Sequence, residues 1–97
     1  MTELFFIVSL DKSLPILKPM ARACNRNGIS WCCFFTGEGV KQLEDVDLVE
    51  VLANSKRAIV CEHSWNEFMG SIECPLELGS QTSNSEIITE AKKVISL

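Results

Sequence analysis

ELFFIVSL, at residues 3–10, is an almost unbroken run of apolar side chains that ends at Asp11. A strand with one face in water alternates apolar and polar residues, whereas a strand covered on both faces is apolar throughout. Two further runs share this character, ISWCCFFT at residues 29–36 and RAIVC at residues 57–61. These three runs predict buried strands of a parallel sheet.

Helical spacing of apolar residues fills the first gap between these strands. Residues 13–27 have this spacing, and Asn27-Gly28 is a good helix stop. Pro19 conflicts with such a helix, because proline lacks the N–H that an interior helical residue donates. We therefore expect a kink at Pro19, or a helix that begins near Lys18.

A second helix is expected over residues 46–54, after Asp45, whose carboxylate suits the N-cap position. Its expected apolar face consists of Val46, Val49, Leu52 and Ala53.

Two serine–glutamate pairs have the spacing of a capping box, in which a cap residue and the third residue of the helix bond each other's backbone. Ser64 and Glu67 predict a short helix from Trp65. Ser83 and Glu86 predict another helix further along the chain.

A weak strand is expected at residues 75–79 and another strand at residues 93–97. Val94 and Ile95 also continue the helical spacing of the segment before them, so a longer last helix is the alternative. Strands that alternate with helices predict a parallel sheet with helices on both faces. We therefore expect a single domain over residues 1–97, with a three-layer α/β/α architecture. In such sheets, reactive groups gather beyond the carboxyl ends of the strands.

The composition is apolar for so short a chain, since 46% of the 97 residues are hydrophobic. A domain of this size buries only roughly 60–65% of the surface that its unfolded chain exposes. Other subunits are the natural cover for the remaining apolar surface, so we expect an oligomer.

The charge and the apolar pattern exclude two classes of partner. The net charge is −4, and no basic cluster is longer than a pair, which argues against nucleic acid. No apolar run approaches the roughly 20 residues that cross a bilayer, and the first residues lack the pattern of a secretory signal. We therefore expect a cytoplasmic protein with no membrane partner.

The chain has five cysteines and no C-x-x-C pair. In the reducing cytosol, these thiols are expected to stay free. Cys32 and Cys33 are neighbours in a strand and point to opposite faces, so both are expected in the core. Cys24, on the apolar face of the first helix, is expected there too.

Cys61 differs from these thiols because it ends a predicted strand shortly before a predicted helix. A helix N-terminus stabilises a thiolate, and a protonated His63 would add to this effect, whereas Glu62 and Glu67 oppose it. A small, packed side chain is the alternative, because free cysteine is among the most buried residue types.

Other roles near Cys61 also stay open. His63 can act as its base if the chain turns between them, and Cys74 can resolve an oxidised Cys61. Cys61, His63 and Cys74 do not have the spacing of a common zinc site, and no metal is expected.

The expected carboxyl edge of the sheet also holds Gly37 and Glu38, after the second strand, and Ser64, near the helix that follows Cys61. These residues are candidates to support a reactive group at this edge. Gly37 and Gly39 resemble a phosphate loop only superficially, because a third glycine is missing and Glu38 would repel phosphate.

Three segments together resemble the DsrE/DsrF-like family, which includes the TusD-type and DsrE-type subunits of intracellular sulfur relays. They are FFTGEGVKQL at residues 34–43, RAIVC at residues 57–61 and ELGSQTSNSEIITEAKKVISL at residues 77–97. The resemblance implies a single DsrEFH-like domain with a five-stranded, mostly parallel sheet. It also implies assembly into trimers, hexamers or complexes with related subunits.

In the sulfur-transferring members of that family, a cysteine just after the third strand carries a persulfide, and Cys61 is the matching position here. The expected function is a sulfur relay, in which Cys61 takes sulfane sulfur from a donor protein and passes it to an acceptor. Such a sulfurtransferase needs no cofactor. The alternatives are a non-catalytic interaction subunit with Cys61 buried, and a redox sensor that pairs Cys61 with Cys74.

Overall fold

A five-stranded sheet organises residues 2–97, the part of the chain that the computed structural model describes. Its order is β4-β3-β2-β1-β5, and every neighbouring pair is parallel. The sheet with five mostly parallel strands is confirmed, and it is parallel throughout. The strands are β1 (Thr2–Val8), β2 (Trp31–Phe35), β3 (Arg57–Cys61), β4 (Glu77–Gly79) and β5 (Ala91–Ser96).

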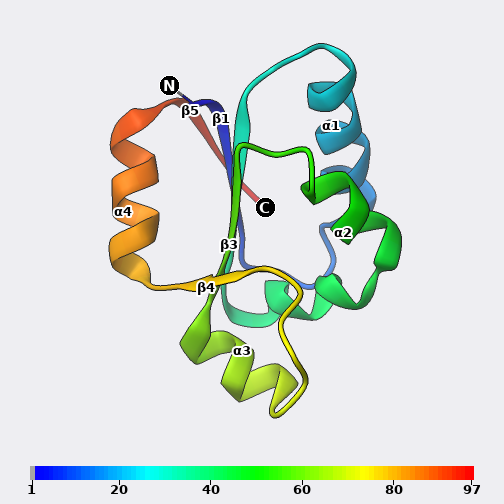
Figure 1. Ribbon diagram of the computed structural model, residues 1–97, viewed down its shortest axis with the longest axis vertical. Helices are drawn as coiled ribbons and strands as arrows, with labels where there is room; N and C mark the ends of the chain where they lie inside the picture. Colours follow the sequence, from blue (N-terminus) through cyan, green and yellow to red (C-terminus); the bar gives the residue numbers. More distant parts are fainter. Residues whose placement is uncertain (1) are drawn as a thin grey trace.

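Helices cover both faces of this sheet, as the expected three-layer α/β/α architecture requires. α1 (Leu14–Arg26) and α2 (Val46–Leu52) lie on one face, and α4 (Gln81–Glu90) lies on the other (Figure 1). α3 (Glu62–Met69) extends beyond the carboxyl ends of the strands and packs against the 3₁₀ helix η1 (Gly37–Glu44). Across residues 2–97, none of these helices has the length and apolar character needed to cross a membrane.

The core has two parts because side chains alternate between the faces of each strand. We name them the α1/α2 cluster, which includes Phe6, Cys33 and Phe35, and the α4 cluster, which includes Phe5 and Cys61. All five residues of β2 are buried, as expected for a strand covered on both faces. The core positions expected for three cysteines are confirmed: Cys24, Cys32 and Cys33.

The structure corrects the start of the first helix. α1 begins at Leu14 and continues through Pro19, so a start near Lys18 is wrong. Pro19 leaves the carbonyl oxygen of Pro15 without its helical partner. Both prolines are exposed, so water can solvate that oxygen and the helix tolerates the loss.

The N-cap of α2 is confirmed, but its expected apolar face is wrong in part. Asp45 accepts a hydrogen bond from the Leu48 N–H at 2.9 Å and one from Lys18 Nζ at 3.0 Å. This anchoring to α1 turns Leu48 and Leu52 into the core and leaves Val46 71% exposed.

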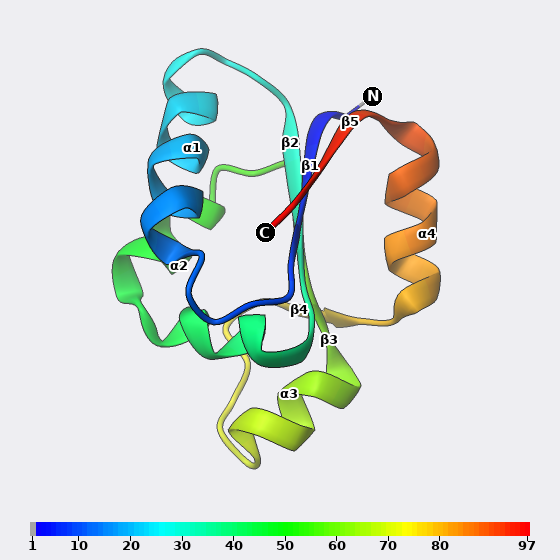
Figure 2. The ribbon, with the colours of Figure 1, turned by 180° about the vertical axis from the view of Figure 1, so that it is seen from behind.

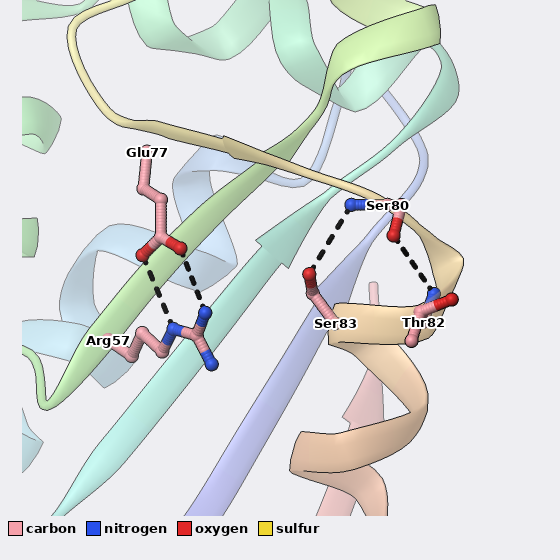
Figure 3. A network of polar contacts seen from close by, with 5 residues as sticks. All are labelled: Arg57, Glu77, Ser80, Thr82 and Ser83. Carbon is pink, nitrogen blue, oxygen red and sulfur yellow. Dashed lines mark hydrogen bonds and ion pairs between the residues drawn. The ribbon is translucent and has the colours of Figure 1, made fainter.

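Neither serine–glutamate pair forms the expected capping box. α3 already begins at Glu62, so Ser64 is its third residue rather than its cap. In α4 the cap is Ser80, and Ser83 is the third residue. The Ser83 hydroxyl accepts from the Ser80 N–H, and the Ser80 hydroxyl accepts from the N–H two residues on (Figure 3). The two serine hydroxyls thus bond backbone N–H groups at the start of α4, and no glutamate is needed for this.

Gly39 brings η1 against the end of β1. A Cβ atom at this position would lie 2.3 Å from the carbonyl oxygen of Val8. The buried Gln42 side chain secures the same contact, because its amide nitrogen donates to the Leu10 carbonyl at 2.6 Å and to the Ser13 hydroxyl at 3.1 Å. η1 is thereby held at the carboxyl edge of the sheet.

We expect Gly39→Ala to lower the free energy of unfolding by about 3 kcal/mol, the upper part of the usual range for an overpacked site, because a backbone carbonyl cannot rotate away. Urea denaturation measures this loss. Gly28→Ala is the comparison, since a Cβ there meets nothing within 4 Å and only the positive φ of 64° is strained. Its loss should be about 1 kcal/mol; equal losses for the two variants would contradict the close approach of η1.

Candidate functional site

Strand β3 passes directly into helix α3 at Cys61. This residue is both the last of β3 and the N-cap of α3, with φ −62° and ψ 117°. The side chain of an N-cap residue faces the N–H groups of the second and third helical residues, here His63 and Ser64. The absence of a linking residue therefore places the Cys61 thiol at the first turn of α3.

Hydrocarbon covers one side of Cys61. The thiol belongs to the α4 cluster, together with Phe34, Ile59 and Ile87. It retains 9% of its surface exposed. Cys61 is therefore nearly buried, and a small part of its surface remains in contact with solvent.

Hydroxyl groups lie on the other side of Cys61. The Ser64 hydroxyl accepts a hydrogen bond from the Gly37 N–H at 2.9 Å and lies 3.4 Å from the Thr36 hydroxyl. Thr36 directly follows β2, and the parallel register of β2 with β3 places it beside Cys61. Because Gly37 supplies the hydrogen that Ser64 accepts, the Ser64 proton remains available to a neighbouring acceptor.

These polar groups lower the pKa of Cys61. Burial is the largest single influence and raises this pKa, because a thiolate loses water. The hydroxyl and N–H of Ser64, the hydroxyl of Thr36 and the N–H of His63 together outweigh it. The neutral thiol makes no short cap bond, since it is a weak acceptor, and the same donors bind a thiolate more strongly.

At three other thiols, burial is not outweighed by hydrogen-bond donors. Burial is the largest cause of a raised pKa at Cys24, Cys33 and Cys74. All five cysteines are free. In contrast to Cys24, Cys33 and Cys74, Cys61 thus has surroundings that favour the thiolate.

The imidazole of His63 is not brought to Cys61. The side chain is 89% exposed, and its Nε2 lies 3.8 Å from the Glu67 carboxylate one turn later in α3. The backbone N–H of His63, rather than its ring, is among the groups that lower the Cys61 pKa. The geometry therefore assigns no base role to this side chain.

Cys74 is not brought to Cys61 either. It packs against the α1/α2 cluster, whereas Cys61 belongs to the α4 cluster on the opposite face of the sheet. The two thiols therefore pack in different parts of the core, and both are free.

Gly37 and Glu38, the two candidate residues after β2, have different surroundings. Gly37 has φ 56°, a conformation that favours glycine, and its N–H points to Ser64. Glu38 is exposed on η1. Thr36, immediately before them, lies at the expected carboxyl edge, but its contribution to the Cys61 pKa was not predicted. Its signal was its place at the carboxyl end of the strand next to β3.

A second helix begins beside Cys61. Gly79, the last residue of β4, is the register partner of Cys61 and leads into α4. An ion pair of 2.8 Å between Arg57 and Glu77 links β3 to β4 (Figure 3). The chain leaves these two strands in different directions, since α3 extends past the edge and α4 covers one face. Cys61 and Gly79 both lie at the carboxyl ends of their strands, the edge at which parallel sheets commonly bind ligands.

Within residues 2–97, no three histidine, cysteine, aspartate or glutamate side chains lie close enough together to hold a metal ion. Models of known protein families give no match to this chain, and neither do curated protein sequences.

We expect Ser64→Ala to raise the pKa of Cys61 and to slow its alkylation at neutral pH several-fold, because a donor to the thiolate is lost. The rate of reaction with iodoacetamide across pH measures this, with the modified residue identified by mass spectrometry. In the wild type, Cys61 should still be alkylated at a pH low enough to protonate an ordinary cysteine, because its pKa is lowered.

Ser85→Ala is the matched control, because the Ser85 hydroxyl donates to the Gln81 carbonyl on the exposed side of α4. Its pH profile should equal that of the wild type. A Ser64→Ala protein that is folded, by circular dichroism, and has an unchanged profile would refute the role of this hydroxyl.

Proposed function

We propose that this chain is a sulfur-relay protein that carries sulfane sulfur as a persulfide on Cys61. The observation that supports this most is the place of Cys61, which is both the last residue of β3 and the N-cap of α3. The uncharged hydrogen-bond donors around it lower its pKa. Sulfur exchange requires a thiolate, and the thiolate fraction at a given pH rises as the pKa falls.

The chemistry has two displacement steps. The Cys61 thiolate attacks the outer sulfur of a donor persulfide, a new S–S bond forms, and the donor leaves as a thiolate. An acceptor thiolate then attacks the outer sulfur on Cys61, and Cys61 leaves as a thiolate. The outer sulfur moves between thiols without net oxidation or reduction, so no metal or organic cofactor takes part.

The surroundings of Cys61 suit the second step in particular. A thiol of lower pKa is a better leaving group in sulfur exchange. The hydroxyls of Ser64 and Thr36 and the first N–H groups of α3 stabilise the departing anion. Neither step requires the imidazole of His63.

The five free cysteines support a cytoplasmic location, since a reducing compartment keeps thiols unpaired. The small exposed fraction of Cys61 favours partner proteins that present a persulfide or a thiol on a projecting segment. The resemblance to the DsrE/DsrF-like family supports homo-oligomers, such as trimers or hexamers, or complexes with related subunits.

A non-catalytic interaction subunit is the second candidate function. Large apolar side chains that remain exposed support it, because an assembly would cover them. The most exposed are Leu10 (62%), Ile16 (55%), Val46 (71%) and Ile72 (58%). In this reading Cys61 is a packing residue and reacts as slowly as the core cysteines.

Exposure of the native protein to inorganic polysulfide should add the mass of one sulfur atom to Cys61, as read by peptide mass spectrometry under non-reducing conditions. We expect Cys61→Ser to lose this adduct and Cys74→Ser to keep it, because Cys74 lies on the other face and its pKa is raised. A small-molecule thiol should then remove the added sulfur.

Modification of other cysteines with Cys61 unmodified would contradict the relay and favour the interaction subunit. A disulfide between Cys61 and Cys74 under mild peroxide would favour the redox sensor instead.

A further inference from the structure

The outer edge of β5 is unpaired. β5 pairs with β1 along one side, and no strand within residues 2–97 pairs with its other side. Figure 2 shows β5 in the foreground, with no helix in front of it. It has six residues, whereas β4, at the opposite edge, has three. A free edge of this length is a ready template for another strand.

Alternate residues of β5 turn their backbone groups toward the free side. The Leu97 N–H donates to the Ile7 carbonyl at 2.8 Å, and the Leu97 carbonyl accepts from the Ser9 N–H at 3.2 Å. The backbone N–H and carbonyl of Leu97 thus both point toward β1, and this direction alternates from one residue of β5 to the next. The residues whose backbone N–H and carbonyl point to the free edge are Lys92, Val94 and Ser96.

We propose that β5 pairs in antiparallel orientation with β5 of a second copy of this chain, about a twofold axis at Val94. In this register Val94 lies opposite Val94 of the second copy, and Lys92 lies opposite Ser96. Each outward residue then belongs to a pair that exchanges two hydrogen bonds. The two sheets become one continuous sheet.

Charge selects this register over its neighbours. With the axis at Val94, Lys92 lies opposite Ser96 and Lys93 opposite Ile95. An axis at Lys93 or at Lys92 would place that lysine opposite the same lysine of the second copy, and two like charges directly opposite each other destabilise the pair. An axis at Ile95 would leave Lys92 without an opposite residue in β5. Lysines on an edge strand usually prevent pairing; here they exclude the competing registers.

The self-complementary sequence is what identifies the occupant as a second copy. Val94 is an apolar side chain that remains 41% exposed in the middle of the strand. In an antiparallel pair, opposite side chains lie on the same face, so the two Val94 side chains pack together at the axis. The lysines lie on either side of this contact, at its polar rim.

The proposed interface is separate from Cys61. In the order β3-β2-β1-β5, Cys61 lies three strands from β5, about 14 Å at the usual strand spacing. Antiparallel pairing sends the carboxyl edges of the two sheets in opposite directions. The pairing therefore leaves the surroundings of each Cys61 unchanged, and the assembly and the sulfur chemistry can be tested independently.

Sedimentation equilibrium of the full chain should give at least twice the chain mass of 10.8 kDa for the wild type. We expect Val94→Lys and Val94→Glu, each alone, to halve the assembled mass and to raise the dissociation constant by about tenfold, because like charges meet at the axis. Val94→Thr keeps the strand neutral and should assemble as the wild type does.

Mixing the Val94→Lys and Val94→Glu proteins should restore the wild-type mass, since opposite charges then meet at the axis. This restoration depends on Val94 facing Val94 and not on general surface charge. A wild type that is monomeric, a Val94→Lys assembly of unchanged mass, or a mixture that fails to reassemble would each overturn the proposal. Circular dichroism and an unchanged alkylation rate of Cys61 confirm that the variants are folded.

Discussion

The site depends on one constraint of the backbone, the direct passage of β3 into α3 at Cys61. Since no residue links the strand to the helix, one side chain ends the sheet and caps the helix at the same time. Its sulfur therefore meets hydrocarbon from the α4 cluster on one side and the first N–H groups of α3 on the other. Burial and polar stabilisation act on the same atom with opposite effects on its pKa.

The surrounding fold determines whether burial or the hydrogen-bond donors have the larger effect on the pKa of Cys61. Gly39 lets η1 approach the end of β1, and this brings the Gly37 N–H to the Ser64 hydroxyl. Ser64 lies beside the hydroxyl of Thr36, and both hydroxyls lower the pKa of Cys61. These donors are uncharged, so they favour a thiolate without a neighbouring cation whose own charge depends on pH. A site built in this way suits a sulfur that must accept and release another sulfur.

The pattern of apolar residues along the sequence was sufficient to predict those elements whose structure depends on burial alone. The apolar runs predicted the parallel sheet, and Cys61 followed from its place at the end of one run. Ser64 was misassigned as a cap, because the pattern S-x-x-E is local whereas its bond to Gly37 depends on the packing of η1. For the same reason, the contribution of Thr36 was not predicted. His63 is close to Cys61 in sequence, but the first turn of α3 directs its ring to solvent.

The most direct measurement is the titration of the Cys61 Cβ chemical shift by NMR in the native protein. The shift reports ionisation of this sulfur alone, without a reagent that must reach it. We expect the pKa of Cys61 to lie below that of an ordinary cysteine and below that of Cys74. A pKa of Cys61 at or above the ordinary value would mean that burial outweighs the donors of α3 and η1, and would contradict the account.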